Sequence, residues 1–295
     1  MRKNLQAIAL LRSLSTGIDA PVLTLMVLSH GATLPTVSLM IGAYSFTVIL
    51  AEFPSGVFAD LYGRKLSFLF STLFTLAAYT SLLFAHSAIP LLFSMVLMGL
   101  GRAFASGSID ALAIDEAQTD AELVKVTARL SILQSAGLAL GALLGGWLAG
   151  FGKDYQVNIL TVMGLMVLLS SLTLFTVHEP RRAPPHAPDE SGRLANHLRE
   201  SFTFLRQPGL VRMLLIFAAV SGFTMLSLET YWQPALKSFS PSPWLFGVIS
   251  SAGFAVTILA SKLTEHRLTH LKGTGIPLLL GLKLLLGLSV AALML

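Results

Sequence analysis

Cysteine is absent from the sequence, and charged residues are scarce. Asp, Glu, Lys and Arg make up 12% of the 295 residues, whereas a soluble domain carries about 25%. Without cysteine the chain can form no disulfide, no thiolate metal site and no cysteine nucleophile. The shortage of charged surface excludes a soluble enzyme, a nucleic-acid-binding protein and a disordered chain.

Long apolar stretches occupy most of the sequence instead. Hydrophobic residues make up 54% of the chain, and the mean hydropathy is +0.74. A helix needs about 20 apolar residues to cross the hydrocarbon core of a bilayer. The stretches that approach this length cover residues 5–28, 34–58, 66–86, 89–113, 129–151, 158–177, 210–233, 244–262 and 275–295. The sequence therefore predicts an all-α, multi-pass membrane protein surrounded by lipid.

The basic residues predict the orientation of the chain. If the N-terminus is cytoplasmic, most of the 20 Lys and Arg residues fall in cytoplasmic segments, and the outer loops hold only Lys153 and Lys237. This asymmetry satisfies the positive-inside rule. We therefore expect a cytoplasmic N-terminus in the cell (inner or plasma) membrane. The basic pI reflects topology, so no nucleic-acid partner is expected.

One long polar loop, residues 178–209, divides the predicted spans. It opens with a proline-rich, charged stretch, HEPRRAPPHAPDESGR. The predicted organisation is an N-terminal six-helix bundle over 1–177, a cytoplasmic central loop over 178–209 and a partial C-terminal bundle of three helices over 210–295.

The junction of the second and third spans combines small, acidic and basic residues at close spacing. The residues are Gly56, Asp60, Gly63, Arg64 and Lys65. We expect a close helix contact at Gly56 and a sharp turn at Gly63. Asp60 and Arg64 lie four residues apart and can pair if the helix continues that far. Such a latch would control a cytoplasmic gate; the alternative interpretation is an ordinary solvated turn.

This G-x-x-x-D-x-x-G-R-K pattern resembles the signature loop of the major facilitator superfamily. The six-span first half, the long middle loop and the inside N-terminus agree with that resemblance. It implies a secondary transporter with twelve spans in two bundles that rock against each other. This chain would hold a complete first bundle and part of the second. Three explanations remain open: a truncated gene product, a minimal transporter that forms a homo-oligomer, or a fragment that needs a complementing chain.

Ionisable residues inside the predicted spans are the candidates for proton coupling. An arginine near mid-membrane costs at least about 2.5–3.5 kcal/mol, so Arg102 in the fourth span must face a partner or a wet cavity. Arg102, Ser106 and Asp110 are spaced to form one polar stripe on a helix. In the superfamily, an arginine in span four is implicated in proton coupling. Asp19 in the first span is the predicted proton carrier; the alternative is a structural ion pair with Arg12 or Arg102.

Glycines recur four residues apart in the fifth span. They are Gly137, Gly141 and Gly145, and Gly146 follows directly. Such spacing removes side chains from one face and lets another helix approach closely. It is also similar to the fifth-helix motif of proton-driven exporters, although Ala142 replaces the proline of that motif. Generic helix packing is the alternative interpretation.

The remaining candidate is Glu229, at the outer end of the seventh span. It is either a substrate contact in the cavity or a residue that faces outer water. The sequence contains no H-E-x-x-H pattern and no phosphate-binding glycine loop, so we expect no enzyme activity, metal or cofactor.

These observations predict a secondary active transporter, most directly a proton-coupled exporter of small amphipathic molecules. Its partners would be a small-molecule substrate and protons. A proton-coupled metabolite importer and a truncated, non-transporting membrane remnant are the alternatives.

Overall fold

The computed structural model describes residues 2–106, 108–115, 119–179, 230–239 and 242–255. Met1–Arg182 and Gln233–Leu263 form one compact unit, and Ala183–Trp232 and Thr264–Leu295 form a second. Of the second unit, only residues 230–232 are described. The predicted span over 275–295, most of the span over 210–233 and Glu229 lie outside the described residues.

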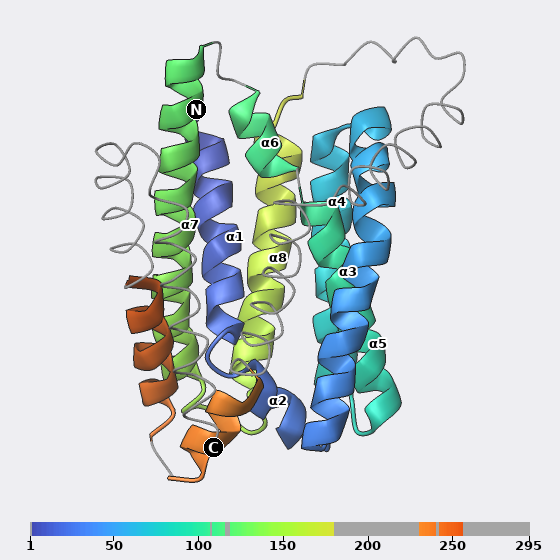
Figure 1. The fold of residues 1–295 in the computed structure, drawn as a ribbon, viewed down its shortest axis with the longest axis vertical. Coiled ribbons are helices and arrows are strands. Elements are labelled where there is room, and N and C mark those ends of the chain that lie inside the picture. Colours follow the sequence, from blue (N-terminus) through green and yellow to red (C-terminus); the bar gives the residue numbers. More distant parts are fainter. Residues whose placement is uncertain (1, 107, 116–118, 180–229, 240–241, 256–295) are drawn as a thin grey trace, which may run out of the picture. The chain divides into compact units, whose positions relative to one another are not determined.

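The described residues are helical, with no strand among them, which confirms the predicted all-α fold (Figure 1). The labelled helices are α1 (Lys3–Asp19), α2 (Leu23–Ser29), α3 (Leu34–Tyr62), α4 (Arg64–Leu83), α5 (Ala88–Ala105), α6 (Ile109–Ile114), α7 (Asp120–Leu148) and α8 (Gln156–Thr176). Two further helices cover 230–237 and Trp244–Ala255.

The long helices of the first unit run side by side and alternate in direction (Figure 1). Five stretches of this part of the chain are long and apolar enough to cross a membrane, and the bent pair α1–α2 makes a sixth. Large apolar side chains such as Leu39, Phe46 and Ile49 are more than 60% exposed. In a membrane such side chains lie in contact with lipid, so their exposure carries no penalty.

Proline and glycine set the breaks in the first half of the unit. The α1–α2 pair is bent by 51°, with Pro21 in the break. Proline has no N–H to donate to the preceding helical turn. At the other end of α3, Gly63 has a φ of 100°, a conformation that favours glycine. The helix therefore ends at Tyr62 and does not continue from Asp60 to Arg64.

The predicted fourth span is not one continuous helix. α5 ends at Ala105 and α6 begins at Ile109. The Ser108 hydroxyl donates a hydrogen bond to the Ala105 carbonyl at 2.8 Å, and serines that bond local backbone in this way compete with helical hydrogen bonds. The expected stripe of Arg102, Ser106 and Asp110 is consequently broken. Ser106 contacts Glu52 on α3 at 3.0 Å, whereas Asp110 contacts α1 and α7.

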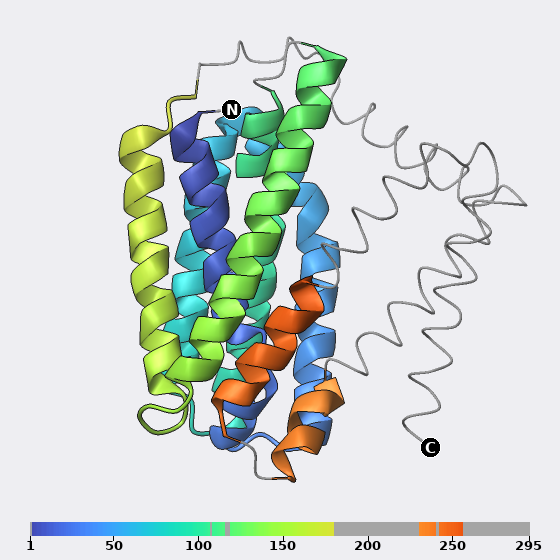
Figure 2. The same ribbon diagram turned by 90° about the vertical axis from the view of Figure 1, so that its left-hand side faces the viewer.

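The glycines of α7 lie directly against backbone of other helices. A Cβ atom on Gly137 would lie 2.6 Å from the Leu10 carbonyl oxygen, and one on Gly141 would lie 2.8 Å from the Gly17 Cα. Gly145 meets the Ile18 backbone in the same way. On another face of α7, a Cβ on Gly146 would lie 2.6 Å from the Cα of Gly247. Figure 2 shows Trp244–Ala255, in red, lying along α7.

Replacing Gly141 with valine tests the contact between α1 and α7. The added side chain overlaps α1 backbone, which cannot move aside as a flexible side chain can. We expect the free energy of unfolding to fall by about 1–3 kcal/mol, as at other overpacked sites. A lower midpoint of thermal unfolding in detergent measures this loss. Gly164→Val on α8 is the matched control, because a Cβ there meets nothing within 4 Å among the described residues. Equal midpoints for the two variants would contradict the contact.

Candidate functional site

Asp19 is the last residue of α1 and lies just before the break in the first span. Its side chain is buried, with 7% of its surface exposed. The Tyr79 hydroxyl on α4 donates a hydrogen bond to Asp19 Oδ2, and Oδ1 has no hydrogen-bond partner within the described part of the chain. A buried carboxyl with one free oxygen is a group that can take up and release a proton.

Neither proposed ion-pair partner of Asp19 contacts it. Arg12 lies two turns earlier on α1, about 10 Å along the helix axis. Its Nη1 atom lies 3.5 Å from Asp110 Oδ2 instead. Arg102 lies in the last turn of α5, is exposed, and is close enough to Arg12 for the two charges to repel each other. Asp19 and Arg102 therefore belong to separate parts of the site.

Asp110 is the centre of the second polar cluster, which joins three helices. Its Oδ2 atom accepts a hydrogen bond from Gln134 Nε2 on α7 at 3.0 Å, in addition to the contact with Arg12. Its Oδ1 atom is buried and has no partner among the described residues. The cluster links α1, α6 and α7 through one carboxylate. A change in its charge therefore alters contacts on all three helices at once.

The gate motif forms a third cluster, at the end of the bundle where α1 begins. Arg64 Nη1 lies 2.7 Å from Asp115 Oδ2, the first residue after α6. Lys65 Nζ donates to the Leu174 carbonyl at 2.8 Å. Asp60 is exposed and makes no ion pair with any described residue. The motif therefore ties α4 to α6 and α8, and not α4 to α3 as a pair of Asp60 and Arg64 would.

Glu179 completes this cluster, and nothing in the sequence singled it out. Its two carboxylate oxygens accept hydrogen bonds from the backbone N–H groups of Arg64 and Lys65 at 3.0 and 2.9 Å. These N–H groups have no helical partners, because they open α4. The negative charge also lies at the positive end of the helix dipole. A side chain at Gly63 would lie 2.8 Å from Glu179 Oε2, so glycine leaves room for the carboxylate.

The close helix contact expected at Gly56 is absent among the described residues. A Cβ atom on Gly56 would meet nothing within 4 Å in the described part of the chain. Gly56 lies on an exposed face of α3, between exposed residues such as Phe53 and Val57. The expectation was wrong for this part of the chain because a single glycine, unlike the repeated glycines of α7, does not define a face.

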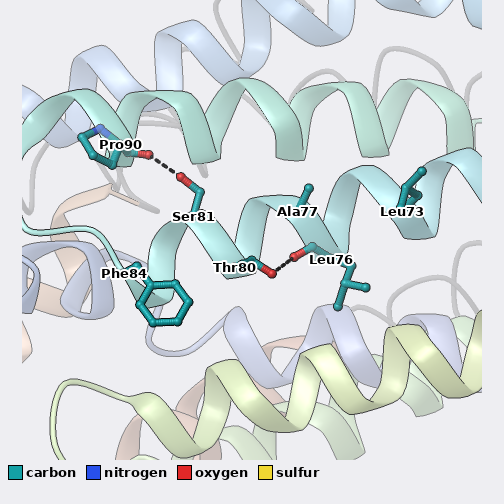
Figure 3. A pocket seen from close by; sticks show the side chains of 7 residues that line it. All are labelled: Leu73, Leu76, Ala77, Thr80, Ser81, Phe84 and Pro90. Atoms are coloured by element: carbon teal, nitrogen blue, oxygen red, sulfur yellow. Dashed lines mark hydrogen bonds between the residues drawn. The ribbon is translucent and has the colours of Figure 1, made fainter.

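An apolar groove is lined by none of the residues of these clusters. It follows α4 beside the start of α5 and has a volume of about 660 Å³ (Figure 3). The lining residues are Leu73, Leu76, Ala77, Thr80, Ser81, Phe84 and Pro90. Both lining hydroxyls donate to the protein's own backbone carbonyls, Thr80 to Leu76 and Ser81 to Pro90. The groove thus lacks the free polar groups that orient a solute.

Sequence comparison identifies the family. The sequence profile of the Major Facilitator Superfamily matches residues 7–295. The chain belongs to this superfamily. The superfamily is one of transporters and not of enzymes.

Two relatives indicate how far the similarity extends. The uncharacterized MFS-type transporter YxaM of Bacillus subtilis (strain 168) is 25% identical over 262 residues, which are 86% of this chain and 63% of YxaM. The multidrug resistance protein MdtH of Aeromonas hydrophila subsp. hydrophila is 33% identical over 112 residues, which are 38% of this chain and 28% of MdtH. The chain therefore spans less than two thirds of the length of either relative.

Solved structures share the fold. The nucleoside transporter NupG has a TM-score of 0.70 at 13% identity, and the match covers 90% of this chain and 67% of NupG. The D-xylose-proton symporter has a TM-score of 0.64 at 14% identity, covering 90% of this chain and 69% of the symporter. These similarities confirm the transporter fold.

Truncating Glu179 tests its role at the start of α4. We expect Glu179→Ala to lower the free energy of unfolding by about 1 kcal/mol, as for other lost helix caps. Glu179→Gln keeps one acceptor oxygen and should lower the free energy of unfolding by less. Thermal unfolding in detergent measures both variants, and added salt should reduce the difference, since this carboxylate is only partly buried. Equal stability of the alanine variant and the wild type would contradict the role.

Proposed function

We propose that this chain exports small amphipathic molecules in exchange for protons, by alternating access. Asp19 carries this proposal, because it is a buried carboxyl with an unpaired oxygen at a break in a membrane span. The similarity of 112 residues to a protein named for multidrug resistance supports export. We further propose that the N-terminus is cytoplasmic and that the chain lies in the cell membrane.

In this proposal the proton binds to the free oxygen of Asp19. Tyr79 holds the other oxygen, so the carboxyl keeps one orientation while it gains and loses the proton. Arg102 acts on the cluster around Asp110 by repelling Arg12, which forms an ion pair with Asp110. Protonation of Asp110 would release Arg12 and loosen the contact between α1 and α6.

The other candidate residues control movement in this proposal. The cluster of Arg64, Lys65, Asp115 and Glu179 fixes the ends of α4, α6 and α8. This end of the bundle would be the cytoplasmic gate. The glycines of α7 give a contact without interlocking side chains, along which helices slide or bend. Gly146 makes such a contact with Gly247, which lies beyond the central loop.

The central test is accumulation of a fluorescent lipophilic cation in efflux-deficient cells that express this chain. We expect lower accumulation than in cells with empty vector, and an uncoupler should abolish the difference. Asp19→Asn should also abolish it at matched membrane abundance, because an amide cannot carry the proton. Asp154→Asn is the control, since Asp154 is exposed in the loop before α8.

Accumulation equal to that with empty vector, at normal abundance of the wild-type chain, would contradict export of such cations. Higher accumulation that the uncoupler abolishes would indicate import. Full activity of the Asp19→Asn variant would contradict the proton-carrying role while leaving transport itself intact.

Asp60 provides a separate test of the gate. Asp60 lies in the last turn of α3, where the negative end of the helix dipole disfavours its charge. The positive N-terminal end of another helix would stabilise that charge when it comes close. We therefore expect Asp60→Asn to abolish transport without reducing membrane abundance, as measured in the same cells. Asp60→Glu keeps the charge and is the matched control. Unchanged transport by Asp60→Asn would contradict the gate role.

A further inference from the structure

Gln233 inserts its side chain into the broken hydrogen-bond ladder of the first span. In a continuous helix the N–H of Thr24 would donate to the carbonyl of Ala20, four residues earlier. Both groups bond to Gln233 instead. Thr24 N–H donates to Gln233 Oε1 at 3.0 Å, and Gln233 Nε2 donates to the Ala20 carbonyl at 2.9 Å.

A carboxamide suits this position because it offers the same pair of groups that the broken ladder leaves open. One oxygen accepts from the free N–H, and one NH₂ group donates to the free carbonyl. Gln233 is 3% exposed and Thr24 is 6% exposed. Backbone groups left unpaired in such dry surroundings are costly. The bend of the first span therefore depends on a side chain that lies beyond the central loop.

The backbone held in this way is directly beside Asp19. Ala20 follows it in sequence, and the carbonyl of Asp19 itself accepts a hydrogen bond from Val22 N–H at 2.9 Å within the same turn. On its other side, α1 is held against α7 at Ile18 and Gly145. The backbone at Asp19 is thus held by α7 on its N-terminal side, at Ile18, and by Gln233 on its C-terminal side, at Ala20.

We propose that Gln233 is a positioning residue for Asp19: its carboxamide completes the broken ladder between Ala20 and Thr24 and so links the Asp19 backbone to the second half of the chain. This inference rests on the proposed function of Asp19 as the proton carrier. When the segment that bears Gln233 moves away from α2, both hydrogen bonds break together. Movement of that segment therefore reaches Asp19 through its backbone.

A double-mutant cycle with Pro21 tests the structural part. Gln233→Met has a similar length but lacks both groups, and we expect it to lower the midpoint of thermal unfolding in detergent by several degrees. Pro21→Ala removes the ring that interrupts the helix and restores an N–H at position 21. The helix can then continue, so that the Thr24 N–H bonds to the Ala20 carbonyl. In the Pro21→Ala background, Gln233→Met should lower the midpoint by less than half as much as it does in the wild type. Gln156→Met, at the exposed start of α8, is the matched control. Equal losses in both backgrounds would overturn the proposal.

Chemical labelling of Asp19 tests the positioning part. Dicyclohexylcarbodiimide reacts with carboxyl groups in membranes, and mass spectrometry follows the peptides that hold Asp19 and Asp110. We expect Gln233→Met to speed labelling of Asp19 several-fold and to leave Asp110 unchanged, with Asp19→Asn as the blank. An unchanged rate at Asp19, or equal acceleration at both residues, would overturn the positioning role.

Neither measurement requires transport. A wild-type chain that moves no substrate would contradict the proposed function and leave both of these results readable. If Gln233→Met does not accumulate in the membrane, Gln233→Asn replaces it. This variant keeps the carboxamide but is one methylene too short to span both backbone groups, so the same outcomes are expected and the same results would overturn the proposal.

Discussion

The contact between α1 and α7 is the constraint on which the rest of the described unit depends. Hydrophobic burial does not drive helices together inside a bilayer, because lipid tails are as apolar as the side chains. Close packing must supply the attraction, and here the absence of side chains at Gly137, Gly141 and Gly145 allows it. On α1, Gly17 meets the α7 backbone in turn. Both helices carry polar groups of the site, so their separation fixes where these groups lie.

Polar groups in the unit are placed according to what they cost in the membrane. The cluster of Arg64, Lys65, Asp115 and Glu179 lies where helices end and charges are needed to satisfy backbone groups. Within the spans, hydrogen bonds to carbonyls predominate. Asn158 on α8, for example, donates to the carbonyl of Gly145 at 2.9 Å. Asp19 and Asp110 are buried carboxylates that each keep one oxygen without a described partner, and Asn158 Oδ1 and Thr173 Oγ1 also lack one. Of these groups the carboxylates are the ones that can take up a proton, which is a reason to expect function at Asp19 and Asp110.

The sequence predicted the features that depend on order along the chain. Apolar length located the first six spans, since a bilayer imposes about 20 residues on each. The glycine spacing predicted the packing face of α7, and the motif at Gly63 predicted the turn. Contacts between distant residues were beyond reach. Tyr79 lies 60 residues from Asp19, and Glu179 lies 115 residues from Arg64. No spacing rule joins such pairs, because helix packing creates them. The break at Ser106 was missed because the stretch 89–113 is mostly apolar and long enough for one span, whereas local serine hydrogen bonds interrupt the helix.

That break also explains how Arg102 is connected to the gate motif. A helix that ends leaves its last carbonyls without helical partners. Two serines from neighbouring helices bond to carbonyls in the last turn of α5. Ser55 on α3 donates to the Ala103 carbonyl, and Ser67 on α4 donates to the Phe104 carbonyl, each at 2.9 Å. These serines lie near the two ends of the α3–α4 junction that carries Gly63. The turn that bears Arg102 is therefore fixed by the helices that carry the gate motif. Movement of the α3–α4 junction would shift the Arg102 charge relative to Arg12, so the proposed gate and the cluster around Asp110 would move together.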